Sequence, residues 1–242
     1  MFTLDLDKLT PEQRAMVALW EEHMKAEFQD KDARASCDTM VANPYVNHVP
    51  VLTGGVGRRQ LLNYYSRYFI PGQPPDVEIM PISRTVGQER IVDEFVYRCT
   101  HSIPLVWLLP GVPPTGRRLE IPTVVIVSFE DGKMKSEHLY WDQASALVQL
   151  GLLDPTGLPV AGVEVARKAL DPATVPSNLL MKRTINDGAR RRRPDDLARK
   201  YPTDDSPGSS HTFLTFPELI RESDTSRPSP PSFDVTSGGK MV

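Results

Sequence analysis

Apolar residues recur at every third or fourth position in the first part of the chain, which is the spacing of one helix face. Residues 10–28 show it most clearly, and Thr10 and Pro11 there supply an N-cap and a first helical residue. The same spacing predicts a second helix over residues 32–42 and a third over residues 58–69. Three helices are therefore expected before any long strand.

The period of the apolar positions changes to two in the next part of the chain, as in half-buried strands. Four such strands are predicted, over residues 77–87, 90–103, 118–130 and 133–142. The turn between the last two, Glu-Asp-Gly-Lys, is a strong hairpin signal. Helices followed by antiparallel strands predict an α+β fold, in which the helices cover one face of a curved sheet and leave a cavity beneath them.

These elements make up one domain over residues 10–152. Residues 153–185 carry a weak helical pattern and several prolines, and we expect them to pack on the domain as an extension. Over residues 186–242 prolines and serines accumulate, while apolar residues become too sparse to offset the entropy of ordering. That tail is expected to be mostly disordered.

The composition is that of an ordinary globular protein, with 40% hydrophobic residues, 24% charged residues and a net charge of −3. No overall field attracts nucleic acid or an anionic membrane, so a small neutral molecule is the expected partner. The N-terminus lacks the basic region of a signal peptide, and no apolar run approaches the roughly 18 residues of a membrane span. We expect a cytoplasmic protein. A basic run near Arg190 is a nuclear-import signal, a polyanion contact or solvated linker.

The last predicted strand carries the most informative polar pattern. Strand alternation places one set of side chains, His138, Tyr140 and Asp142, on one face of the strand. The other face carries Glu137, Leu139 and Trp141. A face with three titratable side chains is either open to solvent or lines a pocket. We interpret it as a pocket wall.

The second predicted strand has a mainly apolar and aromatic face that includes Asp93, Phe95, Tyr97 and His101. An aspartate and a histidine in an apolar wall can have the perturbed proton affinities of acid–base groups. His101 alone is equally compatible with a hydrogen bond to a carbonyl at the strand end.

Two further pocket candidates lie outside these strands. His48 follows the second helix on an extended segment and points into a cavity mouth or lies on a surface loop. Trp107 lies in an insertion between two strands and is a candidate substrate contact.

Several classes of site lack support in the sequence. The histidines at 48, 101 and 138 have none of the short spacings of zinc motifs, so no metal is expected. The glycine-rich segment 53–59 lacks the ending of a phosphate-binding loop and is interpreted as a plain loop. No Gly-x-Ser-x-Gly motif is present, which disfavours a covalent hydrolase mechanism.

The order of helices and strands over residues 10–152 resembles the SnoaL-like polyketide cyclases of the nuclear transport factor 2-like superfamily. Its most specific part is the last strand, Trp141-Asp142, followed by a leucine-rich Gln-Leu-Gly segment at residues 147–151. The resemblance implies a cone-shaped α+β fold with N-terminal helices packed on a curved, mostly antiparallel sheet. It also implies ring closure by a cofactor-free aldol reaction, with Asp142 at the position of the acid–base aspartate.

We therefore expect an enzyme, a cofactor-independent cyclase, isomerase or lyase of secondary metabolism that acts on a small polyketide-like carbonyl compound. The expected catalytic residues are Asp142, His138 and His101. The expected substrate contacts are His48, Tyr140, Tyr97, Phe95, Asp93 and Trp107. The alternatives are a non-catalytic ligand-binding or dimerisation module, and a lactone hydrolase, since relatives with this extended form often carry names such as carboxymethylenebutenolidase.

A homodimer through the outer face of the sheet is also expected, as is common in the superfamily. Residues 124–127, Val-Val-Ile-Val, supply apolar side chains to both faces of one strand. The second apolar face needs a cover, which is a second copy or the C-terminal extension.

Overall fold

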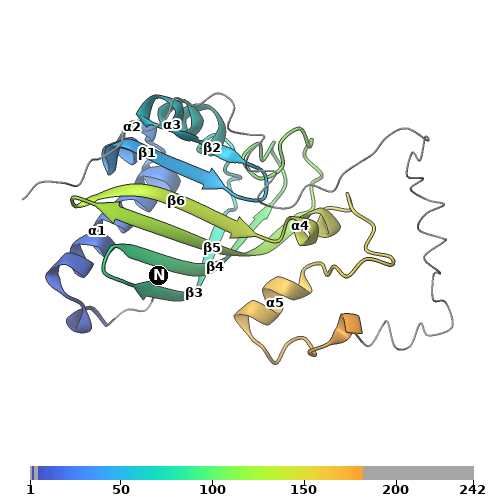
Figure 1. Cartoon of the computed structure of the whole chain (residues 1–242). Coiled ribbons are helices and arrows are strands. Elements are labelled where there is room, and N and C mark those ends of the chain that lie inside the picture. The colour runs from blue at the N-terminus through green and yellow to red at the C-terminus, as the bar shows by residue number, and fades with distance from the viewer. Residues whose placement is uncertain (1, 3–4, 182–242) are drawn as a thin grey trace, which may run out of the picture. The chain divides into compact units, whose positions relative to one another are not determined.

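The computed structural model describes residue 2 and residues 5–181 (Figure 1). The first long helix, α1 (Pro11–Lys25), begins where the sequence predicted. The hydroxyl of Thr10 accepts a hydrogen bond from the backbone N–H of Gln13, whose side chain accepts one from the N–H of Thr10. This capping box satisfies two amide groups that the helix itself leaves unpaired.

The remaining helices are short. A 3-10 turn, η1 (Leu6–Lys8), precedes α1, and α1 and α3 each continue into a wide π-helical turn. The elements are η2 (Ala26–Asp30), α2 (Ala33–Asp38), α3 (Arg58–Tyr64), η3 (Tyr65–Phe69), α4 (Gln143–Gln149) and α5 (Glu164–Leu170).

The strands form one curved six-stranded sheet in the order β2-β1-β6-β5-β4-β3. β1 and β6 run parallel, and the other neighbouring pairs run antiparallel. The strands are β1 (Met40–His48), β2 (Thr53–Val56), β3 (Glu78–Val86), β4 (Arg90–Thr100), β5 (Arg118–Glu130) and β6 (Lys133–Trp141). The expected α+β class and the mostly antiparallel sheet are confirmed.

Two local predictions were wrong, both in the segment that joins the second and third helices. α2 ends at Asp38, and the chain from Met40 onward pairs with β6, because sheet hydrogen bonding outweighs the helical spacing of a few apolar residues. The glycine-rich segment forms the edge strand β2 rather than a loop. Gly54 has φ 131°, and a Cβ atom there would lie 2.1 Å from the carbonyl oxygen of Val46, so only glycine allows this pairing.

The core lies between the helices and the inner face of the sheet. β5 alternates strictly, with its odd-numbered residues buried and its even-numbered residues half-buried on the outer face. Buried rings of α3 and η3, such as Tyr64 and Tyr65, pack into the same core. The covered face is therefore the one that can hold an enclosed site.

Beyond β6 the chain continues over the domain. The Ser145 hydroxyl in α4 donates to the Gly162 carbonyl at 2.9 Å, and α5 contacts β4 and β5. In the described part of the chain, no helix is long and apolar enough to cross a membrane. The expected disordered tail and the basic run near Arg190 lie outside the described residues.

Candidate functional site

A cavity of about 460 Å³ lies between α1 and the inner face of β3 to β6. Its wall is largely aromatic and aliphatic. The lining rings, apart from that of Phe2, are Trp20, Phe28, Phe69, Phe95, Tyr97, Trp107 and Trp141. Glu27 and Glu137 also line the cavity and are nearly fully buried, so their carboxyl groups lie in an apolar environment.

α1 supplies one wall of the cavity through residues at helical spacing. Trp20, His23 and Glu27 follow one another at intervals of three and four, so they lie on one side of the helix. The indole N–H of Trp20 donates to Asp93 Oδ2 on β4 at 2.8 Å, which fixes the helix against the sheet. The turn η2 continues the helix and carries Glu27.

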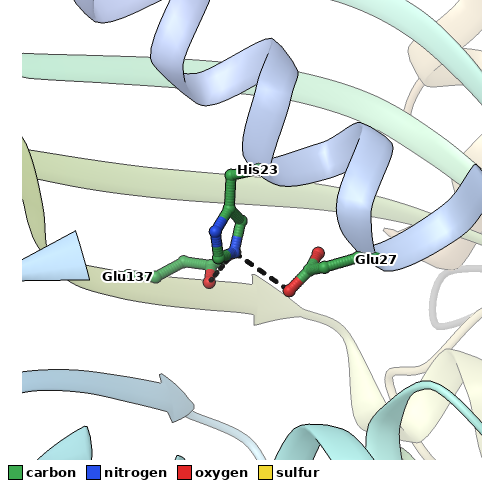
Figure 2. A group of neighbouring side chains, drawn as sticks. All are labelled: His23, Glu27 and Glu137. Carbon is green, nitrogen blue, oxygen red and sulfur yellow. Dashed lines mark hydrogen bonds and ion pairs between the residues drawn. The ribbon is translucent and has the colours of Figure 1, made fainter. Parts of the chain in front are cut away.

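A buried polar cluster joins α1 to β6 (Figure 2). His23 Nε2 lies 3.0 Å from Glu27 Oε1 and 4.0 Å from Glu137 Oε2. The hydroxyl oxygen of Tyr65 lies 3.3 Å from the same nitrogen. We call His23, Glu27 and Glu137 the triad.

The hydrogen-bond network fixes the orientation of the imidazole in the triad. His23 Nδ1 lies 2.7 Å from the Thr39 hydroxyl and 3.1 Å from the carbonyl oxygen of Ser36. The Thr39 hydroxyl donates its own proton to the Ser36 carbonyl at 2.7 Å, so both neighbours of Nδ1 act as acceptors. This network assigns the proton to Nδ1 and leaves Nε2 facing the two carboxyl groups.

Burial and mutual repulsion shift the proton affinities in the triad. The pKa of Glu137 is raised to about 8, mainly by burial and also by the neighbouring carboxylate of Glu27, while His23 and a hydrogen bond from Tyr65 oppose these effects. Burial alone lowers the pKa of His23, but the two carboxyl groups outweigh it, so that pKa is raised. The cluster can therefore hold and exchange protons near neutral pH.

The pocket face of β6 is the opposite of the one expected. The cavity is lined by Glu137, Leu139 and Trp141. His138 and Tyr140 lie on the outer face, where His138 is hydrogen-bonded to the hydroxyl of Tyr45 and Tyr140 is 41% exposed. The alternation of residues along β6 correctly divides its side chains between two faces. The more polar of these faces is the outer one.

Asp142 does not line the cavity. It is the N-cap of α4, and its Oδ1 accepts a hydrogen bond from the backbone N–H of Ser145 at 3.2 Å. Its carboxylate therefore satisfies an amide at the start of a helix.

The expected aromatic face of β4 does turn toward the cavity. Phe95, Tyr97 and Trp107 are among its lining residues. Asp93 is buried on the same face but outside the lining, where both its oxygens accept hydrogen bonds at 2.7 Å from the guanidinium of Arg84. Through its hydrogen bonds with Arg84 and Trp20, Asp93 holds β4 against β3 and α1.

The two remaining histidine candidates lie outside the cavity lining. His48 is buried, with its ring tilted against those of Tyr64 and Trp107 and edge-on to that of Trp141, and burial lowers its pKa to about 3. His101 is buried beside the hydroxyl of Thr115, at 3.2 Å, and burial lowers its pKa as well.

The triad was missed at the level of the sequence, although one signal for it exists. His23 and Glu27 fall on the apolar stripe of α1, and a charged residue on such a stripe is a candidate buried group. Nothing in the local pattern links them to Glu137, which lies far away along the chain.

The model of the SnoaL-like polyketide cyclase family matches residues 13–150, which is more than half of the chain. No curated protein sequence matches.

Three solved structures illustrate the similarity in fold. TsrD from Streptomyces laurentii is 19% identical, with a TM-score of 0.47, over 60% of this chain and 100% of that one. IdmH from Streptomyces antibioticus, a proposed polyketide cyclase, is 20% identical, with a TM-score of 0.43, over 59% and 99%. A protein with a ketosteroid isomerase-like fold from Catenulispora acidiphila is 17% identical, with a TM-score of 0.42, over 60% and 96%.

Proposed function

This chain belongs to the SnoaL-like polyketide cyclase family and has its nuclear transport factor 2-like fold, and on that premise we propose that it cyclises or isomerises a small carbonyl compound. The observation that carries the proposal is the triad: two carboxyl groups line a cavity whose wall is otherwise mostly apolar, and they meet an imidazole that is buried behind them. Such a combination suits proton transfer to and from carbon, since the apolar surroundings strengthen each electrostatic contact.

The reaction that fits is an intramolecular aldol ring closure. A carboxylate of the triad removes a proton from the carbon beside a carbonyl group, and the resulting enolate carbon attacks a second carbonyl of the same molecule. A proton held by the triad then passes to the new alkoxide oxygen, so the proton balance closes within the site. An isomerisation uses the first step and returns the proton to a different carbon.

The substrate class follows from the cavity wall. A volume of about 460 Å³ lies in the range of pockets for small organic ligands. The rings that line it offer flat apolar surfaces, which favour a compact, polyketide-like molecule. The only lysine in the lining, Lys25, is ion-paired with Asp30 and more than half exposed.

This proposal transfers the acid–base role from Asp142 to the triad. Asp142 caps α4 and lies outside the lining, whereas Glu27 and Glu137 line the cavity. His138 and Tyr140 lie on the outer face of β6 and cannot reach a substrate in the cavity without a change of face.

The test compares Glu27→Gln with Glu22→Gln, which changes an exposed glutamate on the same helix. With a diketone model substrate, we expect Glu27→Gln to lower kcat by at least about 100-fold, the usual effect of a general acid–base group. Glu22→Gln should turn over like the unchanged protein. Substrate binding without turnover in the unchanged protein would contradict the proposal and indicate a binding module.

We also propose that the chain forms a homodimer through the outer face of the sheet. Tyr140 is exposed there, and the half-buried Val124 and Ile126 lie opposite Tyr140 and His138 in the register of β5 and β6. Light scattering of the full chain should give a dimer mass, and Tyr140→Glu should lower it. A monomer mass at micromolar concentration would sink this idea.

A further inference from the structure

The triad brings two carboxyl groups together around one imidazole nitrogen. Among the described residues, the ion-pair contacts of Glu27 and Glu137 are both made with His23. All three side chains are at least nine-tenths buried. Two carboxyl groups face one imidazole nitrogen in an apolar wall, and a bound divalent cation balances the charge that these groups carry once they have released their protons.

The spacing of the three potential donor atoms suits a metal ion. One ligand atom from each of His23, Glu27 and Glu137 lies within 4.8 Å of the other two, and His23 Nε2 is 3.0 Å from Glu27 Oε1. Nitrogen and carboxylate ligands lie about 2.0–2.2 Å from zinc, which places neighbouring ligands about 3.3 Å apart in a tetrahedron. The 4.0 Å distance between His23 Nε2 and Glu137 Oε2 has to shorten for all three atoms to bind one ion.

The imidazole already has the orientation of a metal ligand. A histidine that binds a metal through one ring nitrogen usually donates the other N–H to a carbonyl or a similar acceptor. His23 Nδ1 faces the Ser36 carbonyl and the Thr39 hydroxyl, which leaves Nε2 directed at the two carboxyl groups (Figure 2). The ligand and the group that orients it are therefore both present.

The cavity gives an entry path and room for further ligands. Glu27 and Glu137 both line it, so an ion between them lies next to its open space. Three protein ligands and an accessible fourth position are typical of zinc sites that exchange ligands. One nitrogen and two single oxygens favour zinc over calcium or magnesium, which need more oxygen ligands.

We propose that the triad is a binding site for a divalent transition-metal ion, Zn²⁺ above all, and that the bound ion inhibits the enzyme. The ion occupies the lone pairs that otherwise exchange protons with the substrate, so proton transfer stops while it is bound. The inhibition rests on the proposed function, whereas the binding itself does not.

Titration of the full-length, chelator-treated chain with zinc chloride in a calorimeter tests the binding. We expect one ion per chain. Glu137→Gln and His23→Gln should each weaken binding by more than about 10-fold, since losing a ligand costs at least as much as losing a group that orients one. His138→Gln, on the outer face of β6, is the matched control and should bind like the unchanged protein.

Cobalt absorbance gives a second readout on the unchanged protein, independent of any variant. Co²⁺ bound by one nitrogen and two oxygens should give visible bands that added Zn²⁺ removes. No saturable binding, or equal binding by Glu137→Gln and the unchanged chain, would overturn the site. Turnover that persists with one zinc ion bound would overturn the inhibition alone, and absence of turnover in chelator contradicts the proposed function instead.

Discussion

The two faces of β6 show how differently neighbouring residues of one strand can be used. On the inner face, Glu137 is 4% exposed and meets His23 of α1 inside an apolar cavity. On the outer face, the next residue, His138, is only half-buried and bonds to Tyr45 of the neighbouring strand. Enclosure by the helices, and not the number of polar residues on a face, brings a titratable residue of this strand to the cavity.

The largest expected effect separates these two faces directly. Glu137→Gln should lower kcat by about 100-fold to 10,000-fold, because it removes a proton-exchanging carboxyl group from the cavity. His138→Gln should leave kcat nearly unchanged. Steady-state kinetics of both variants on one substrate checks this, and equal losses would show that the two faces do not differ in function.

The same contrast exists on β4, at the level of stability. Asp93→Ala removes the buried partner of Arg84 and should lower the free energy of unfolding by about 3–5 kcal/mol. Glu94→Ala, on the outer face, loses only a hydrogen bond with Ser83 and should cost less than about 1 kcal/mol. Urea denaturation of the two variants measures the difference. A larger loss for Glu94→Ala would contradict the assignment of the faces.

His48 should make the stability of the protein depend on pH. Its folded pKa of about 3 lies below its ordinary value of 6.5, so only the unfolded chain takes up a proton between these values. Stability should therefore fall as pH falls through this window, with His48 contributing a loss of about 3 kcal/mol at pH 4.5. His48→Gln should remove that part of the slope. Unfolding curves from pH 7 to pH 4.5 provide the measurement, and an unchanged slope would contradict the depressed pKa.

The smallest effect is expected at Asp142, which ends the polar face. Asp142→Ala removes the N-cap of α4 and should lower the free energy of unfolding by about 1 kcal/mol. Turnover should be retained, because the side chain lies outside the cavity lining. Parallel measurement of melting and turnover tests both statements, and a loss of turnover without a loss of stability would restore Asp142 to the mechanism.

Much of the fold follows from local signals in the sequence. The capping box at Thr10, the period-two strands and the hairpin after Glu130 are short-range features, and the structure contains all of them. The second helix was predicted too long, because the chain from Met40 pairs with β6, and that pairing depends on residues distant in sequence. The glycine-rich edge strand was missed because glycines are unfavourable in strands, although its partner β1 is close in sequence.

The candidate site was less accessible to the sequence. The wall residues Phe95, Tyr97 and Trp107 were among the expected contacts, since an aromatic strand face tends to be covered. The pocket lining was expected on the other face of β6, because three titratable side chains were interpreted as a pocket wall, whereas the cavity is lined by Glu137, Leu139 and Trp141. In an antiparallel sheet covered on one side, a polar face more often meets solvent.

By itself, the sequence determined which side chains share a face, because the periods of strands and helices are properties of the local backbone. It placed His23 and Glu27 on one side of a helix and Glu137 on one side of a strand. Only the tertiary structure decided that these two sides meet, since the packing of α1 over the sheet depends on the whole core. Burial then raised the pKa of Glu137, because desolvation acts on the folded site and not on the chain that forms it.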